Sequence, residues 1–112
     1  MAMIDSAPLG TFEEQVMLAV LRKGDEAYGM NVRRELELVT GRDVAIGAVY
    51  ATLDRLEAKG LVASSRAGDG AASRRLFAVT ALGGRVLAES RTMRERLWEG
   101  VDLGRLLSGA AT

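Results

Sequence analysis

The sequence predicts a mainly α-helical domain with one small β-hairpin (α+β), arranged as a winged helix-turn-helix. Three observations predict this fold. Apolar residues recur at helical spacing in four segments, two short strand-like segments flank a glycine-bearing turn, and only 4% of the residues are aromatic. A core with so few rings must be built mainly from Leu, Val, Ala and Met, and that composition favours helices.

Composition narrows the function before any motif is considered. The 112 residues suffice for one domain, and they include no cysteine and no histidine. Disulfides, thiolate nucleophiles, zinc sites with Cys or His ligands and Ser-His-Asp triads are therefore excluded. The chain also lacks the lysine-bearing glycine loop that cradles nucleotide phosphates. We therefore expect no enzymatic activity, no catalytic residue, no cofactor and no metal.

The sequence gives no sign of membrane insertion or export. The longest apolar run, residues 16–21, is far too short to cross a bilayer. The first residues contain neither the charged region nor the apolar region of a secretion signal. A cytoplasmic protein without membrane contacts is the expectation.

The first helix is expected over residues 12–23 and should end at Gly24. Thr11 and Glu14 have the spacing of a capping box, which satisfies free N–H groups at a helix start. Residues 16–21 are apolar on nearly every side, which indicates burial on more than one face. In so small a domain this indicates a second chain. We therefore assign Val16 and Val20 to a dimer interface.

A second helix is expected over residues 28–40, with Gly41 at its end. A link of only six residues, 42–47, leads to a third helix. Two helices joined by so short a link form a helix-turn-helix. The predicted core stripe of the second helix is Val32, Leu36 and Val39, with Asn31, Arg33 and Arg34 facing elsewhere.

The third helix is expected to place one apolar face inward and one smooth face outward. Val49, Leu53 and Leu56 form the inward stripe, while Gly60 and Leu61 fit a Schellman ending. Such an outward face suits a helix lying in the major groove of DNA, with Thr52 and Arg55 contacting base edges. An ordinary solvated helix face is the alternative. The outward residues are Ala48, Ala51, Thr52 and Arg55.

A hairpin should follow directly, with strands over residues 61–66 and 74–79. Arg66, Arg74 and Arg75 are expected near its tip. This order of elements is typical of a winged helix, whose basic wing contacts phosphates or the minor groove. The whole chain has zero net charge, but residues 61–80 carry three arginines and one aspartate, so positive charge is concentrated there. A solvated hairpin tip is the alternative.

A fourth helix is expected over residues 81–100, with Thr80 as its cap. Its apolar seam, with Trp98 beside it, is longer than docking on its own small domain requires, which indicates dimerisation. Packing on its own core is the alternative. The predicted organisation is a winged helix-turn-helix at 9–80 and a C-terminal dimerisation helix at 81–107. The seam consists of Leu82, Val86, Met93, Leu97 and Val101.

The arrangement resembles the PadR family of bacterial transcriptional regulators, in its short branch with a single C-terminal helix. Two positions depart from the family pattern: Ile46 stands where Pro is frequent, and Leu76 with Phe77 where paired tyrosines are frequent. The resemblance covers about residues 9–100 and implies a homodimeric repressor that binds a palindromic operator in double-stranded DNA. It is carried mainly by Gly47-Ala48-Val49-Tyr50, Leu53-Asp54-Arg55-Leu56-Glu57, Lys59-Gly60-Leu61-Val62 and Arg74-Arg75-Leu76-Phe77.

The resemblance also implies roles for single residues. It matches Gly47, Ala48, Tyr50, Thr52 and Arg55 to the recognition-helix region. The Tyr50 hydroxyl and the N–H groups of Gly47 and Ala48 are expected to hold a phosphate at the helix N-terminus, with a core role as the alternative for Tyr50. Trp98 resembles an interface tryptophan on which planar effectors stack in some members, with plain packing as the alternative.

Two other functions stay open at this stage. One is a winged-helix module for protein–protein contact, which the zero net charge would suit. The other is a small-molecule sensor without strong DNA binding, centred on Trp98.

Overall fold

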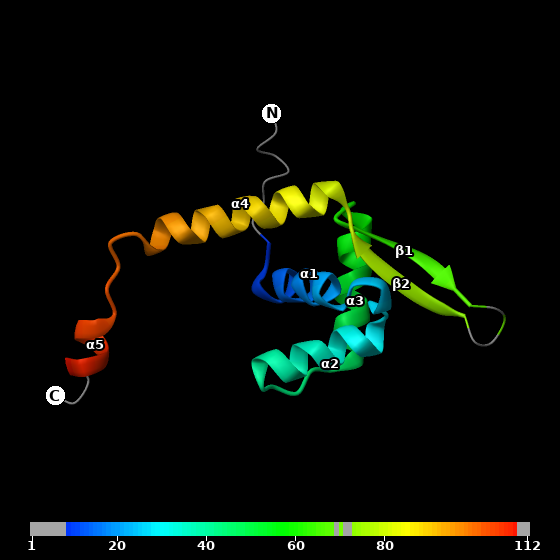
Figure 1. The fold of residues 1–112 in the computed structure, drawn as a ribbon, viewed down its shortest axis with the longest axis horizontal. Helices are drawn as coiled ribbons and strands as arrows, with labels where there is room; N and C mark the ends of the chain where they lie inside the picture. The colour runs from blue at the N-terminus through cyan, green and yellow to red at the C-terminus, as the bar shows by residue number, and fades with distance from the viewer. Residues whose placement is uncertain (1–8, 69, 71–72, 110–112) are drawn as a thin grey trace.

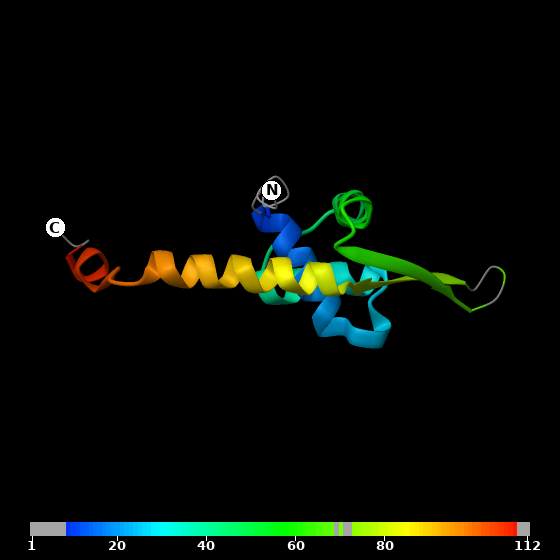
Figure 2. The same cartoon turned by 90° about the horizontal axis from the view of Figure 1, so that it is seen from above.

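The computed structural model describes residues 9–68, 70 and 73–109. Helices α1 to α3 form a body from which the β-hairpin extends on one side and α4 on the other (Figure 1). Seen from above, the hairpin and α4 lie nearly in line along the longest axis (Figure 2). The predicted, mainly α-helical fold with one hairpin is confirmed. Its elements are α1 (Thr11–Lys23), the 3₁₀ turn η2 (Gly24–Glu26), α2 (Gly29–Thr40), α3 (Ile46–Ala58), β1 (Val62–Ala67), β2 (Arg74–Val79), α4 (Ala81–Trp98) and α5 (Gly104–Gly109).

The core lies where α1, α2 and α3 meet and is closed by the base of the hairpin. The inward stripe of α3 is confirmed, since Val49, Leu53 and Leu56 are fully buried. Val16 and Val20 of α1 are buried in the same cluster, so their assignment to a dimer interface is wrong. Helix α1 packs against α2, α3 and β2, which covers Val16 and Val20, whereas Leu18 and Leu21 on its remaining side stay exposed.

The N-terminus of α1 is capped one residue earlier than predicted. The Gly10 N–H donates to Glu13 Oε1 at 3.0 Å, and α1 begins at Thr11. The capping box predicted for Thr11 and Glu14 is therefore wrong. Glu14 is instead used between helices, where it accepts bonds from Ser90 and Arg94 of α4.

Helix α2 ends as predicted, at a left-handed Gly41 with φ of 71°. Two side chains differ from the predicted pattern. Val39 is exposed, because it borders an open groove between α1 and α2 rather than the core. Asn31 is buried, and its Nδ2 donates to the Glu26 carbonyl at 2.9 Å, which ties η2 to α2.

A single turn joins the end of α3 to the start of the hairpin. The Leu61 N–H donates to the Leu56 carbonyl and the Gly60 N–H to the Glu57 carbonyl, both at 2.9 Å, as in a Schellman motif. This turn sends the chain directly into β1, which pairs antiparallel with β2 from Val62↔Val79 to Ala67↔Arg74. The base of β2 is fixed to the body because the buried Phe77 donates its N–H to the Ala27 carbonyl.

Helix α4 begins as predicted, with Thr80 Oγ1 accepting the Gly83 N–H at 3.0 Å. Its first half packs against the body, where Gly83 and Leu87 are buried, and Ser90 and Arg94 farther along bond to Glu14 of α1. The helix ends at Trp98, because Gly100 turns the chain at a φ of 76°, and the short α5 follows. The single helix predicted up to residue 107 is therefore wrong. No helix within the described residues is long and apolar enough to span a membrane.

Candidate nucleic-acid interface

The outward face of α3 is open and built from small side chains. Ala48 and Ala51 are exposed as predicted, and so is Arg55. Thr52 is not, because it lies beside the inward stripe and is only 1% exposed. Its Oγ1 accepts a bond from Arg55 Nη2 at 3.0 Å. Thr52 therefore orients Arg55 through this hydrogen bond. The prediction that Thr52 faces outward toward base edges is wrong.

The N-terminus of α3 leaves two backbone donors free. The N–H groups of Ala48 and Val49 both donate to the Ala45 carbonyl, so the predicted phosphate contact through Ala48 N–H is wrong. Among the described residues, no acceptor lies within hydrogen-bond reach of the Ile46 or Gly47 N–H. Ile46 occupies the first helical position, the place where proline fits a helix start.

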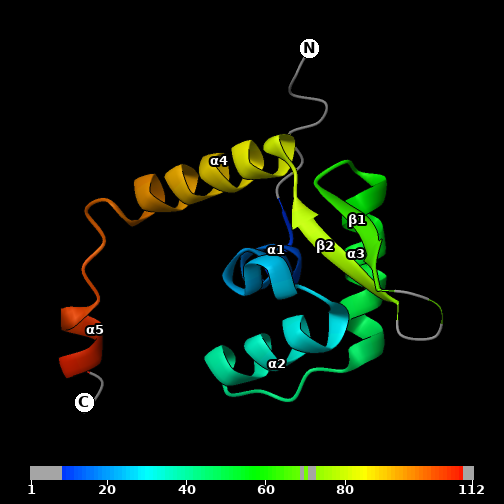
Figure 3. The same cartoon turned by 45° about the vertical axis from the view of Figure 1, so that its right-hand side comes forward.

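Tyr50 packs against the body and also stays partly exposed, while its expected phosphate contact stays a prediction. Its ring packs on the first turn of α2, where a Cβ added to Gly29 would lie 2.3 Å from Tyr50 Cζ. The side chain nevertheless remains 37% exposed. It borders a cleft between the start of α2, α3 and the hairpin, elements that Figure 3 shows side by side.

We call this hollow the arginine cleft; it has a volume of about 500 Å³. Four of the side chains that line it are arginines, and none carries a carboxylate, so the cleft favours an anion. One of these arginines, Arg34, was not predicted as a site residue, because the periodicity of α2 shows only that Arg34 faces away from the core. The cleft is lined by Tyr28, Met30, Arg34, Tyr50, Arg66, Ser73, Arg74 and Arg75.

Three of the four guanidinium groups make only neutral contacts. Arg74 lies over the Tyr28 ring, 4.4 Å from its centre. Arg66 donates to Ser73 Oγ at 3.1 Å, and Arg34 donates to Asn31 Oδ1 at 3.4 Å. Within the described ranges none of the three is paired with a carboxylate. Their charges are therefore available to phosphates.

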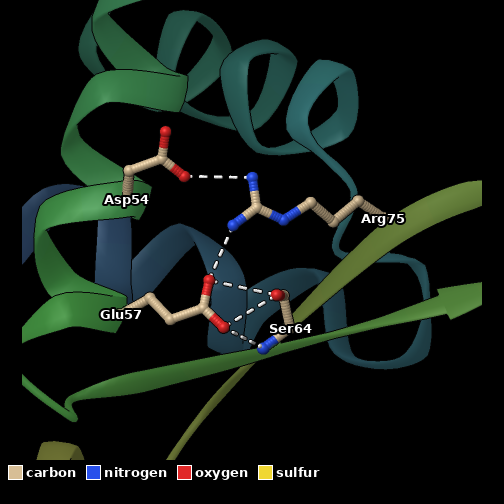
Figure 4. Close-up of polar contacts among 4 residues, drawn as sticks. All are labelled: Asp54, Glu57, Ser64 and Arg75. Atoms are coloured by element: carbon tan, nitrogen blue, oxygen red, sulfur yellow. Dashed lines mark hydrogen bonds and ion pairs between the residues drawn. The ribbon is translucent and has the colours of Figure 1, made fainter.

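Arg75 differs, because it is already neutralised by α3 (Figure 4). Its Nη1 lies 3.0 Å from Asp54 Oδ1 and its Nη2 lies 2.6 Å from Glu57 Oε1. The expectation that Arg75 offers a free charge at the wing tip is therefore wrong. The hydroxyl of Ser64 and the guanidinium of Arg75 lower the pKa of Glu57. This cluster could not be predicted from the sequence, because Arg75 is 18 residues from Glu57 and meets it only through the fold of the hairpin.

The second half of α4 and the segment just after it carry large apolar side chains that no described residue covers. Met93, Leu97, Trp98 and Val101 are all at least half exposed, whereas Val86 packs partly against the core. In α5, Leu106 and Leu107 are also exposed. The predicted seam is thus present on the surface from Met93 onward.

Comparisons with known proteins place this geometry in a family. Residues 17–89 match the Transcriptional regulator PadR-like family. A PadR family transcriptional regulator from Eggerthella lenta DSM 2243 is 30% identical, with 82% of this chain and 80% of that chain covered and a TM-score of 0.64. A PadR-like transcription factor from Bacteroides fragilis is 24% identical, with 80% and 85% covered and a TM-score of 0.70. No curated protein matches the sequence significantly.

The family match runs from within α1 into α4 and so includes the whole helix-turn-helix and wing. It identifies a DNA-binding regulator rather than an enzyme, in agreement with the composition. The chain belongs to the PadR-like family of transcriptional regulators.

Proposed function

We propose that this regulator is a homodimeric repressor that binds a palindromic operator through α3 and the wing, the β1–β2 hairpin. The observation that carries the proposal is the open face of α3 beside a cleft that is lined by three arginines without a carboxylate partner among the described residues. A helix with small outward side chains fits a major groove about 12 Å wide. Arg34, Arg66 and Arg74 then stand next to the phosphates that flank the groove.

Few side chains on α3 are long enough to select bases. With Thr52 buried, Arg55 is the one outward cation of α3, and it is able to make a bidentate contact with guanine. Site selection from random duplexes by the wild type and by Arg55→Ala tests this role. Loss of preference at one symmetric position supports base reading, whereas uniform weakening at an unchanged site assigns Arg55 to the backbone.

The dimer is supported by the uncovered seam of α4. A stripe holding Met93, Leu97 and Trp98 gains most when a second copy covers it through a two-fold, isologous contact. Two recognition helices in such a dimer read half-sites about 10–10.5 base pairs apart, centre to centre. The expected operator is therefore an inverted repeat.

One set of measurements tests the proposal as a whole. Sites selected from random duplexes should contain an inverted repeat, and binding should weaken steeply with salt because phosphate contacts release counterions. Adding the protein to a reporter with this site over its promoter should lower transcription. Binding that salt leaves unchanged would favour a protein–protein module, and raised transcription would refute a repressor.

A response to a small molecule is a second proposed property, favoured by one observation. Trp98 is 54% exposed on α4 and is the single tryptophan of the chain. A planar cationic compound stacking on the indole would quench its fluorescence, with a matching change in operator affinity. Unchanged fluorescence at saturating compound would assign Trp98 to packing alone.

A further inference from the structure

We propose that Arg75 is a positioning residue, which fastens the wing to α3 and contacts no phosphate itself. The inference rests on the proposed DNA-binding role of α3 and the wing, and it deepens that role. The structure that carries it is the wing clamp, defined as Asp54, Glu57, Ser64 and Arg75 (Figure 4).

The wing clamp joins α3 to both strands of the hairpin. From β2, Arg75 bridges two carboxylates with separate nitrogens, Nη1 to Asp54 at 3.0 Å and Nη2 to Glu57 at 2.6 Å. From β1, Ser64 donates its N–H to Glu57 Oε2 at 3.1 Å and its hydroxyl to the same oxygen at 2.8 Å. Residues three apart share a helix face, so the two carboxylates suit the fork of one guanidinium.

The charges of the clamp make it a poor phosphate site. One guanidinium faces two carboxylates, so the group is net negative where DNA would approach. Burial opposes the charged form of Arg75, but the bonds to Glu57 and Asp54 outweigh it and raise its pKa. Arg66 and Arg74, by contrast, have no carboxylate partner among the described residues.

Besides the clamp, the wing is held to the body by the bond from the Phe77 N–H to the Ala27 carbonyl and by a β-bridge between Tyr28 and Leu76, and the clamp is what attaches it to α3. A two-stranded hairpin is marginally stable alone, and only Val62 and Phe77, near its base, are buried. Arg75 lies opposite Arg66 in the register of the two strands. The clamp therefore attaches the hairpin at the same height as Arg66, which is exposed. The angle between the wing and α3, and with it the position of Arg66 and Arg74 beside α3, therefore depends on the clamp.

Arg75→Lys separates positioning from phosphate contact. Lysine keeps the charge and serves well at a phosphate, but its single nitrogen cannot bridge both carboxylates in the way a guanidinium does. We expect affinity for a fluorescent duplex carrying the selected site to fall by about threefold to tenfold, the cost of ordering a loosened wing. The slope of log affinity against log salt should not change.

Glu57→Ala provides a second test, because it breaks the clamp by removing a negative charge and leaves the positive charge of Arg75 in place. Removing a negative charge near DNA should strengthen binding if the clamp has no positioning role, whereas loss of the clamp should weaken it. Arg74→Gln should lower the salt slope by about 0.9 per lost contact, which marks a true phosphate contact. Arg91→Lys, which alters an arginine paired with Glu95 on α4, is the matched control and should bind as the wild type does.

Wing position can also be measured without DNA. The chain contains no cysteine, so nitroxide labels can be attached selectively to Ala58→Cys on α3 and Ala67→Cys on β1, both exposed positions. Labelled chains are diluted in unlabelled ones, so that only the distance between the two nitroxides of one chain is measured. The distribution of this distance should be narrow without a further substitution and broad when Arg75→Lys or Glu57→Ala is added.

Three results would overturn the inference: wild-type affinity of Arg75→Lys, stronger DNA binding by Glu57→Ala, or an unchanged narrow distance distribution in these variants. Wild-type protein that fails to bind duplex DNA would instead refute the proposed function. The distance measurement would then still test the clamp.

Discussion

One methyl group added at Gly83 or at its neighbour Gly84 should change stability in opposite directions. Both glycines lie in the first turn of α4. A Cβ on Gly83 would lie 2.1 Å from the Leu61 carbonyl oxygen and 2.8 Å from Val79 Cγ1, whereas no described atom outside the backbone of α4 itself lies within 4 Å of a Cβ on Gly84. The first obstacle is a backbone atom, which cannot rotate aside. The two variants therefore isolate the close contact of α4 with the body.

The magnitudes follow from these contacts. Gly84→Ala should stabilise the fold by about 0.5–1 kcal/mol, because alanine loses less backbone entropy in a helix. Gly83→Ala gains the same helix term but has to push α4 outward, and overpacking typically costs about 1–3 kcal/mol. The shift also strains the bond from the Gly83 N–H to Thr80 Oγ1, a helix cap worth about 1 kcal/mol. The two variants should differ by about 2–4 kcal/mol, which is the overpacking cost plus the cap, because the helix gain is common to both variants and cancels.

Urea unfolding followed by circular dichroism measures this difference. Protein concentration must be held constant, because dimerisation would contribute to apparent stability. Wild-type unfolding midpoints should lie between those of the two variants. Equal stability of the two variants, or a more stable Gly83→Ala, would refute the packing of α4 against the Leu61 carbonyl.

Three further predictions concern DNA contact, assembly and acid stability. Arg66→Gln with Arg74→Gln should lower the salt slope of duplex binding by about 3.6 in a dimer, at about 0.9 for each of four lost contacts, and anisotropy titrations in several salt concentrations measure it; an unchanged slope would mean that both arginines are merely solvated. Leu97→Glu should give monomers in sedimentation, because a dimer seam would bury an unpaired charge, and a compact wild-type monomer at micromolar concentration would contradict the dimer. The pKa values of Glu13 and Glu57 lie below the ordinary 4.5, so their stabilisation is complete above that pH and is lost as pH falls through the folded-state pKa. Glu13→Gln with Glu57→Gln should therefore lose less stability than the wild type on acidification, and equal losses in urea unfolding would contradict this reasoning.

The sequence predicts well those features that are decided locally. Helix ends at Gly24, Gly41 and Gly60 follow from the left-handed conformations that only glycine adopts readily, and all three have positive φ. The inward stripe of α3 follows from the helical period in the same way. Such features depend on residues within one turn of each other, so no knowledge of packing is needed.

The errors at the candidate site come from contacts between distant segments. Periodicity shows that Val16 is buried but not whether its own chain or a second chain buries it. Thr52 is placed near the boundary of the inward stripe, where the packing of a neighbouring element decides its exposure. Arg75 is 18 residues from Glu57 in sequence, so its ion pair depends on how the hairpin folds back over α3.

The attachment of α4 has a further consequence if the proposed dimer forms, since the helix then acts as a lever arm. Its 18 residues span about 27 Å, and it is held to the body by its first half and by bonds from Ser90 and Arg94 to Glu14. A tilt of about 10° at the attached end moves the free end by about 5 Å over this length. The rise of one base pair is about 3.4 Å. Half-site spacing would thus be set by the angle between α1 and α4, so a change at Glu14 would alter operator choice without altering any DNA contact.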